Sequence, residues 1–182
     1  MAAGDVTTGD VTDLTGARVV LRSPHPDDVE PLVAIFAEPE VARWWPGFDR
    51  SRIESEVVLD DDPASSVYVV DVAGQVAGIV QCYEEPDPEY RSAGIDISLG
   101  TRWHGRGIAV DAIRCLARDL FERRGHHHLT IDPAAANGRA IACYTKVGFR
   151  PVGVLRQNER GGDGTFHDTL LMDMVAGELQ DG

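Results

Sequence analysis

One stretch of this sequence decides the prediction of its fold: Arg102-Trp103-His104-Gly105-Arg106-Gly107-Ile108-Ala109. It joins residues 93–100, which have the pattern of a strand, to a long amphipathic segment with the pattern of a helix. Glycine at such a junction lets backbone N–H groups crowd around a phosphate at the helix N-terminus. Because other tight turns also use spaced glycines, the pair needs support from elsewhere in the chain.

A second cluster about thirty residues further along supplies that support. It consists of Asp132-Pro133, Asn137-Gly138-Arg139-Ala140-Ile141, Tyr144 and Gly148-Phe149. Two other phosphate-binding motifs do not fit the first stretch. A Walker A loop ends in Gly-Lys-Ser/Thr, which is absent, and the dinucleotide fingerprint needs an acidic residue roughly twenty positions on, within a repeated strand-helix-strand unit.

Length and composition predict one globular domain. The chain has 182 residues, of which 43% are apolar, and this is ordinary for a soluble domain with a single core. No segment is long enough to span a bilayer, and the N-terminus lacks a secretory signal, so we expect a cytoplasmic protein. We expect a disordered N-terminal segment over residues 1–13, a domain over 14–176 and a C-terminal tail over 177–182.

The charge balance limits the partners. With 30 Asp and Glu against 17 Lys and Arg, the formal net charge is -13, which argues against nucleic acid and anionic membranes and favours a cationic ligand, although solubility alone explains it equally well. The three cysteines have no paired spacing, which argues against a disulfide framework and a zinc site. Three consecutive histidines, 126–128, cannot all point at one ion, so we expect no metal.

The apolar periodicity predicts about four helices and six to seven strands. The helices are expected over residues 26–37, 51–59, 106–123 and 137–146, and the strands over 17–21, 67–72, 75–83, 93–99, 128–132, 149–156 and 166–175. Because strands 93–99 and 128–132 are joined through a helix, they should lie parallel. The fold class is therefore α/β (α+β), with a single mixed central sheet flanked by helices.

Together, the two clusters resemble the GCN5-related N-acetyltransferases (GNAT), and the resemblance covers about residues 17–174. It implies the GNAT fold, with strands 93–99 and 128–132 splayed apart at their ends. It also implies acetyl-CoA as cosubstrate, with the pyrophosphate on the glycine turn and the pantetheine arm in the gap. The implied cofactor-binding residues are Ile97, Ser98, Leu99, Arg102, His104, Gly105, Arg106, Gly107, Ile108, Ala109, Asn137, Arg139, Ala140, Tyr144 and Lys146.

Acetyl transfer to an amine needs a base, stabilisation of an oxyanion and a proton for the departing thiolate. Asp96 alternates with Ile95 and Ile97, so its carboxylate should project from the opposite strand face and could deprotonate an ammonium directly or through water. The alternative is a solvated residue on an exposed face. A backbone N–H near Ser98 or Leu99, at a strand distortion, would serve the oxyanion.

A finer resemblance is to the aminoglycoside 6'-N-acetyltransferase branch. It is carried by Gly94-Ile95-Asp96-x-Ser98-Leu99, Trp44-Trp45, Asp132-Pro133, Asn137 and Tyr144. It implies that Asp96 is the base, that Asp132 grips substrate amines and that Tyr144 is the acid. The alternative for Tyr144 is a tyrosine packed beside Phe149.

The substrate side is expected to combine aromatic and acidic residues. Trp44 and Trp45 could form a platform for sugar rings or amines, with one of the two in the core. Glu84, Glu85 and Asp87 would add negative potential at the substrate entrance, and the alternative is a solvated loop.

We therefore expect an acetyl-CoA-dependent N-acetyltransferase that modifies an aminoglycoside amine, the 6'-amine by resemblance, by direct attack in a ternary complex, and so confers resistance. Residues 14–22 also resemble acetyltransferases that modify protein N-termini, and siderophore acylation is a further alternative. A non-catalytic sensor of the coenzyme or the drug is the alternative from another class, against which Asp96 and Tyr144 argue. A monomer or a homodimer is expected.

Overall fold

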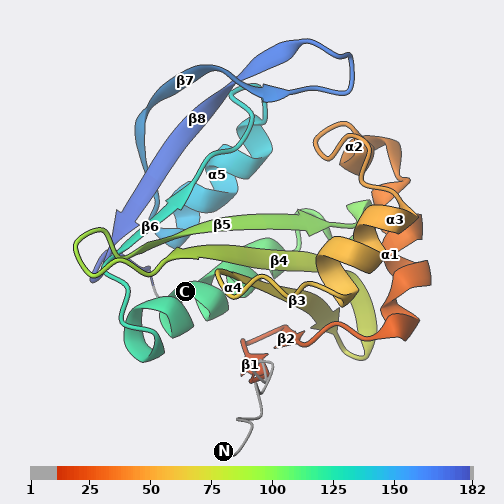
Figure 1. Ribbon diagram of the computed structural model, residues 1–182, viewed down its shortest axis with the longest axis horizontal. Helices are drawn as coiled ribbons and strands as arrows, with labels where there is room; N and C mark the ends of the chain where they lie inside the picture. Colours follow the sequence, from red (N-terminus) through yellow and green to blue (C-terminus); the bar gives the residue numbers. More distant parts are fainter. Residues whose placement is uncertain (1–11, 181–182) are drawn as a thin grey trace, which may run out of the picture.

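The computed structural model describes residues 12–180, and its centre is one eight-stranded mixed sheet (Figure 1). The strand order is β1-β2-β3-β4-β5-β6-β8-β7. The strands are β1 (Leu14–Thr15), β2 (Val20–Arg22), β3 (Ser65–Val72), β4 (Gln75–Glu85), β5 (Ser92–Leu99), β6 (His128–Ile131), β7 (Arg150–Arg160) and β8 (Phe166–Val175). The predicted α/β class with one mixed sheet is confirmed.

Five α-helices are present among the described residues: α1 (Val29–Phe36), α2 (Pro39–Ala42), α3 (Arg50–Ile53), α4 (Ile108–Arg118) and α5 (Gly138–Val147). Short 3-10 helices precede α1 and α4, at Pro26–Asp28 and Thr101–Trp103. Single π-helical turns extend α3 over Glu54–Val58 and α4 over Asp119–Arg123. No described helix has the length and apolar character to cross a membrane.

Two departures from the prediction have simple causes. The periodicity predicted no helix between residues 37 and 51, but Pro39 occupies the first turn of α2, where its missing N–H is not needed. The strand expected over residues 17–21 begins only at Val20, as β2, because residues 16–19 form the turn of a small hairpin with β1, in which the Gly16 N–H donates to the Val19 carbonyl at 2.9 Å. The sheet therefore has eight strands, one more than the upper estimate.

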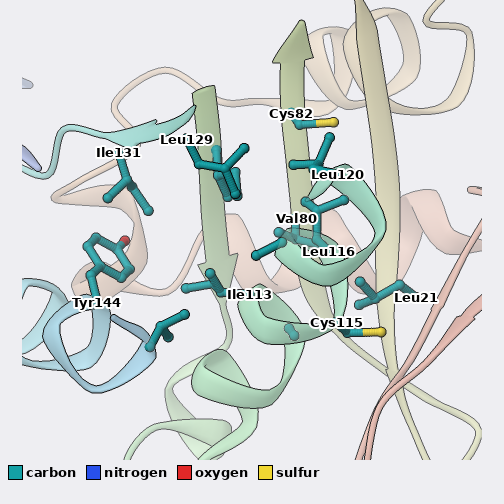
Figure 2. Packing of buried hydrophobic residues seen from close by; sticks show 14 of the residues in the cluster. Leu21, Val80, Cys82, Ile113, Cys115, Leu116, Leu120, Leu129, Ile131 and Tyr144 are labelled. Atoms are coloured by element: carbon teal, nitrogen blue, oxygen red, sulfur yellow. The ribbon is translucent and has the colours of Figure 1, made fainter. Parts of the chain in front are cut away.

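Helices cover both faces of the sheet, as the alternation along the strands requires. On one face, α4 and α5 bury a large cluster that includes Tyr68, Val80 and Leu116. Figure 2 shows side chains of α4 packed against those of the central strands. On the other face, α1 and α3 bury a second cluster that includes Ile53 and Ile79.

The two central parallel strands, β5 and β6, pair over three residues and then diverge. β5 pairs with β6 only from Ser92↔His128 to Gly94↔Thr130, whereas β5 itself continues to Leu99. The parallel arrangement and the splayed ends are both as expected. The last five residues of β5 are thus left without a β6 neighbour, and this opens the sheet.

The sheet is irregular beside this opening, in β4. The β3–β4 register shifts between Val70↔Gly78 and Asp71↔Val76, while β4 pairs with β5 without a shift from Gly78↔Leu99 to Glu85↔Ser92. The distortion expected near Ser98 is therefore a bulge in the neighbouring strand. Gly78 has φ 153, and a Cβ built there would lie 2.0 Å from the Ser98 carbonyl oxygen, so only glycine fits.

The chain ends in a long hairpin, β7–β8, that arches away from the rest of the sheet (Figure 1). Its tip lies against the segment between α2 and α3: a Cβ built on Gly162 would be 3.3 Å from the Pro46 Cβ. After β8, Gln180 N–H donates to the Val147 carbonyl at 2.8 Å, so the predicted tail rests on the end of α5 as far as it is described. Residues 1–11 of the predicted disordered segment, and 181–182, lie outside the described residues.

Candidate active site

A cavity of about 330 Å³ lies where β5 and β6 diverge. Four parts of the chain form its wall: the end of β5, the turn before α4 together with the first turn of that helix, one side of α5, and α2 with the residues after it. The lining residues are Glu40, Val41, Trp44, Trp45, Ile97, Ser98, Leu99, Trp103, His104, Gly105, Gly107, Ile108, Ala109, Val110, Asn137, Arg139, Ala140, Ala142, Cys143, Tyr144 and Lys146.

The turn before α4 has the geometry that its glycines predict. Gly105 and Gly107 adopt φ 70 and 78, in the left-handed region, which other residues reach only with strain. Gly107 is the N-cap of α4, and no side chain of the described residues caps this helix start. The N–H groups of the first turn are thus available to an anion that enters the cavity.

Most of the residues predicted to bind the cofactor line the cavity, but Arg102 and Arg106 do not. The Arg102 guanidinium lies over the Trp103 ring, 4.6 Å from its centroid. The Arg106 carbonyl accepts a hydrogen bond from Arg18 at 2.8 Å. His104 Nε2 lies 2.9 Å from the Leu99 carbonyl oxygen, and this contact fixes the ring between the turn and β5.

Trp103 is a lining residue that the site prediction missed. Its indole Nε1 is buried and has no hydrogen-bond partner in residues 12–180. A buried donor without a partner is rare in folded proteins and is readily satisfied by a ligand. Trp103 lies within the stretch that predicted the turn, but the glycine spacing said nothing about the direction of its side chain.

The wall formed by α5 places polar groups along the cavity. Asn137 Oδ1 accepts from Ala140 N–H at 3.2 Å and caps the helix, as predicted. Arg139 and Lys146 also line the cavity and bring positive charge to it. In a chain with a net charge of -13, these are the charges an anionic ligand needs.

Tyr144 points from α5 into the core at the edge of the cavity, beside Ile131 (Figure 2). Its side chain is buried, and its ring makes an edge-to-face contact with Phe149 at a centroid distance of 6.4 Å. Tyr144 therefore both packs in the core beside Phe149 and lines the cavity. Burial, followed by nearby acidic groups, raises the pKa of Tyr144 well above its usual value. The phenol keeps its proton at neutral pH.

Asp96 occupies the strand face opposite Ile95, as the alternation predicts, and is half-buried. It pairs with Gln81 of β4 in register, and the Gln81 amide in turn donates to the Tyr83 hydroxyl at 2.8 Å. Burial raises the pKa of Asp96, the negative charge of Asp132 raises it further, and the hydrogen bond from Gln81 opposes the shift. The carboxylate is thus a stronger base than a solvated aspartate.

Asp132 follows the last residue of β6, so the end of that strand brings it near Asp96. Its Oδ2 accepts from the Asn158 amide at 3.1 Å, and Thr169 also bonds to the carboxyl. Burial raises the pKa of Asp132 despite these two hydrogen bonds. Both partners come from the β7–β8 hairpin, which therefore orients this carboxylate.

Glu159 is a third carboxylate near this pair, and it was not predicted from the sequence. It is half-buried in β7, where every other residue is exposed. Burial raises the pKa of Glu159, and the charge of Asp132 raises it next. The register of β7 on β8 shifts between Leu155 and Glu159, so no simple alternation could predict which face this residue takes.

None of the predicted acidic residues lines the cavity itself; Asp96 and Asp132 lie near each other, and the remaining three lie elsewhere. Glu84 lies on the sheet face opposite Asp96, where its carboxylate pairs with Arg124 and, at 2.6 Å, with His126. Burial alone would raise the pKa of Glu84, but the bonds from His126 and Arg124 lower it. Glu85 and Asp87 are exposed at the far end of β5 from the cavity, and Glu85 Oε1 accepts from the Asp87 N–H at 3.0 Å.

The two tryptophans after α2 both line the cavity but have different neighbours. Trp45 packs edge-to-face on Phe36 and Phe48, with centroid distances of 5.6 and 5.3 Å. Trp44 lies under the guanidinium of Arg43, 4.6 Å from the ring centroid. Trp45 thus belongs to the aromatic core of α1 and α3, and Trp44 is the one left to face a ligand.

Two of the three consecutive histidines pair with different carboxylates, and the third, His127, has its ring 6.4 Å from that of His128. His126 bonds to Glu84, and His128 Nε2 lies 3.2 Å from Asp173 Oδ2. Residues 12–180 contain no group of three or more His, Cys, Asp or Glu arranged to hold a metal ion.

The chain matches known proteins in sequence and in structure. The family described as acetyltransferase (GNAT) domain matches residues 18–150. The aminoglycoside N(6')-acetyltransferase type 1 of Klebsiella pneumoniae is 28% identical over 156 residues, 75% of this chain and 76% of that protein. A kanamycin resistance protein of Rhizobium radiobacter is 38% identical over 73 residues, 40% of this chain and 66% of that protein. RimJ of Mycobacterium smegmatis, solved in complex with CoA-disulfide, has a TM-score of 0.79 and 21% identity, with 94% and 90% of the two chains covered.

Proposed function

The chain belongs to the GNAT acetyltransferase family, and from this premise we propose that it transfers an acetyl group from acetyl-CoA to an amino group of an aminoglycoside. One observation carries the proposal. The cavity that contains the uncapped start of α4 also reaches Tyr144, and the half-buried carboxylates of Asp96 and Asp132 lie close enough to Tyr144 to raise its pKa. A phosphate-bearing donor and a cationic acceptor can therefore meet at one point.

The residues of the cavity fit acetyl-CoA. The uncapped start of α4 suits its diphosphate, and Arg139 and Lys146 supply positive charge. The buried Trp103 Nε1 has no hydrogen-bond partner among the described residues and could donate to an acceptor on the ligand. When bound, acetyl-CoA supplies the activated acyl group, and the protein supplies the position and the proton transfers.

We assign Asp96 as the base and Tyr144 as the proton donor. The raised pKa of Asp96 brings its proton affinity closer to that of an ammonium group, so it can accept a proton directly or through water. Tyr144 lines the cavity and its hydroxyl carries its proton at neutral pH, so it would donate to a departing thiolate, although its raised pKa makes it a weaker acid than a solvated tyrosine. Asp132, held by Asn158, would bind and orient the amine.

Two lines of support favour an aminoglycoside as the acceptor. Asp96 and Asp132 form a negative site that suits a polycation. The names of two relatives include aminoglycoside acetylation and kanamycin resistance. Acetylation removes a positive charge from such a drug, so this activity would confer resistance.

The test is a steady-state assay of thiol release with acetyl-CoA and kanamycin, tobramycin or kasugamycin as acceptor. We expect turnover with at least one of them. Peptides with free N-termini and small hydroxylysine-type amines serve as alternative acceptors. Turnover of these alone, with all three drugs inert at millimolar concentration, would reject the aminoglycoside class and leave the acetyltransferase assignment intact.

A further inference from the structure

The hairpin at the beginning of the described chain reaches the glycine turn before α4. Arg18 follows the short strand β1, and its Nη1 donates to the carbonyl oxygen of Arg106 at 2.8 Å. A Cβ built on Gly107 would lie 3.7 Å from the same nitrogen. Arg18 therefore touches the peptide that joins Arg106 to Gly107.

Arg18 is itself held in place by the first turn of α4. The carboxylate of Asp111 accepts hydrogen bonds from the backbone N–H groups of Ala17, Arg18 and Val19, at 3.1, 2.6 and 3.1 Å. Gly16 permits this approach, because a Cβ there would lie 2.7 Å from Asp111 Oδ2. The turn of the hairpin is thus bound to the helix whose start it braces.

The bond to the Arg106 carbonyl sets the direction of the next N–H group. In a trans peptide the C=O and N–H bonds point in opposite directions, and no peptide bond among the described residues is cis. Gly107 lines the cavity, whereas Arg18 and Arg106 do not. An oxygen held on the outer side of the turn therefore directs the Gly107 N–H to the inner side.

We propose that Arg18 is a positioning residue, which holds the Arg106–Gly107 peptide so that the Gly107 N–H faces the diphosphate of the acyl donor. The inference rests on the proposed use of acetyl-CoA. A turn with glycine on both sides of Arg106 has wide conformational freedom, and the hydrogen bond from Arg18 selects one orientation before the donor arrives. Preorganised N–H groups bind an anion without the loss of conformational entropy that ordering the turn on binding would require.

The test compares Arg18→Ala with Arg91→Ala by calorimetry with CoA. Arg91 is a matched control, because it is exposed and its Nη2 also donates to a carbonyl, that of Arg124, at 2.6 Å. We expect Arg18→Ala to weaken CoA binding about tenfold, the size of one hydrogen bond to a charged group, and Arg91→Ala to leave it unchanged. Arg18→Lys, which keeps a donor, should recover part of the loss.

Kinetics with shortened donors separate orientation of the turn from other roles. The KM for acetyl-CoA and for acetyl-dephospho-CoA should rise equally in Arg18→Ala, while kcat, the KM for the amine and the KM for acetyl-pantetheine stay as in the parent. A rise confined to acetyl-CoA would mean a contact with the 3'-phosphate and would overturn the proposal. An equal rise for acetyl-pantetheine would mean general damage and would also overturn it.

The proposed function and the role of Arg18 can be rejected separately. If the parent protein binds no CoA at all, the proposed function is rejected before Arg18 is tested. If the parent binds CoA and Arg18→Ala binds it equally well, only the role of Arg18 is rejected.

Discussion

At the scale of single residues, the site depends on carboxyl groups kept partly from water. Burial raises the pKa of Asp96, and the charge of Asp132 adds to the shift. A carboxyl whose folded-state pKa is raised reduces the stability of the folded state as the pH rises from its unfolded-state pKa to its folded-state pKa, because the ionised form is better solvated in the unfolded chain. The burial that makes Asp96 a stronger base therefore also reduces the free energy of unfolding at neutral pH.

Replacing Asp96 with asparagine tests this directly. We expect Asp96→Asn to reduce kcat/KM for the amine by about 100-fold or more, the range of a general base, and to raise the Tm at pH 7–8. Activity assays and thermal unfolding of the same preparation check both effects. A variant with turnover within a few-fold of the parent would remove Asp96 from the role of base.

Asp132 offers a second test, through the pH profile. Because its negative charge raises the pKa of Asp96, Asp132→Asn should lower that pKa. The acidic limb of the pH profile of kcat, which reports ionisation of the base when substrate is bound, should move to lower pH. A limb that stays in place, or moves to higher pH, would contradict the coupling of the two carboxyls.

The positions and contacts of these residues were predictable from sequence to different degrees. The face of Asp96 followed from strict alternation along β5, and the cap at Asn137 followed from residue type. Glu159 was hidden by an irregular register in β7. The partners of Glu84 lie about forty positions away, at Arg124 and His126, and no spacing rule links them.

At the scale of elements, the end of α4 and strands β3 and β4 are tied together by a polar network. Arg124 bonds to Glu84, Asp119 and the Tyr68 hydroxyl, and its side chain is only 16% exposed. Burial alone would raise the pKa of Asp119, but hydrogen bonds from Arg123 and Arg124 lower it. The stability from Glu84 and Asp119 is present at neutral pH and is lost as the pH falls through their lowered folded-state pKa values.

Glu84→Gln and Glu85→Gln form a matched pair that removes the same charge at neighbouring positions. We expect Glu84→Gln to reduce the free energy of unfolding by about 3 kcal/mol, because Arg124 loses a buried partner, and Glu85→Gln to change it by no more than about 0.5 kcal/mol. Neither variant should change kcat/KM for acetyl transfer by more than a few-fold. Denaturant unfolding measures the free energy of unfolding, and the acetyl-transfer assay measures kcat/KM. A large loss of activity in a stably folded Glu84→Gln variant would return Glu84 to the substrate site.

The elements themselves were largely predictable, since most strands alternate and α4 has a clear amphipathic pattern. The exceptions are local: Pro39 begins the short helix α2, which the periodicity did not predict, and residues 14–15 pair with the first predicted strand as β1. At the turn between β1 and β2, contacts with a distant segment help to set the backbone conformation. The contact of Gly16 with Asp111, 95 positions later, is one example.

At the scale of the whole molecule, the net charge of -13 creates a field that attracts cations. A polycationic acceptor would be concentrated near the site, whereas a monoamine would respond less because the interaction scales with charge. Salt screens such fields over about 10 Å at 0.1 M ionic strength and about 3 Å at 1 M.

We therefore expect the KM for a polycationic aminoglycoside to rise several-fold when the ionic strength increases from about 0.05 to about 0.5 M. The KM for a monoamine acceptor in the same assay should change little. Initial rates over a series of salt concentrations provide the measurement. Equal salt dependence for the two acceptors would show that the overall charge has no part in choosing the substrate.

The bulge at Gly78 has a consequence for anyone who alters this protein. Gly78 never faces the cavity, yet its backbone lies so close to the Ser98 carbonyl that a single added methyl group would displace β5. A mutation there would alter the cavity that we propose for acetyl-CoA, although Gly78 is not one of its lining residues. Libraries confined to cavity-lining positions would miss this control over the width of the cavity.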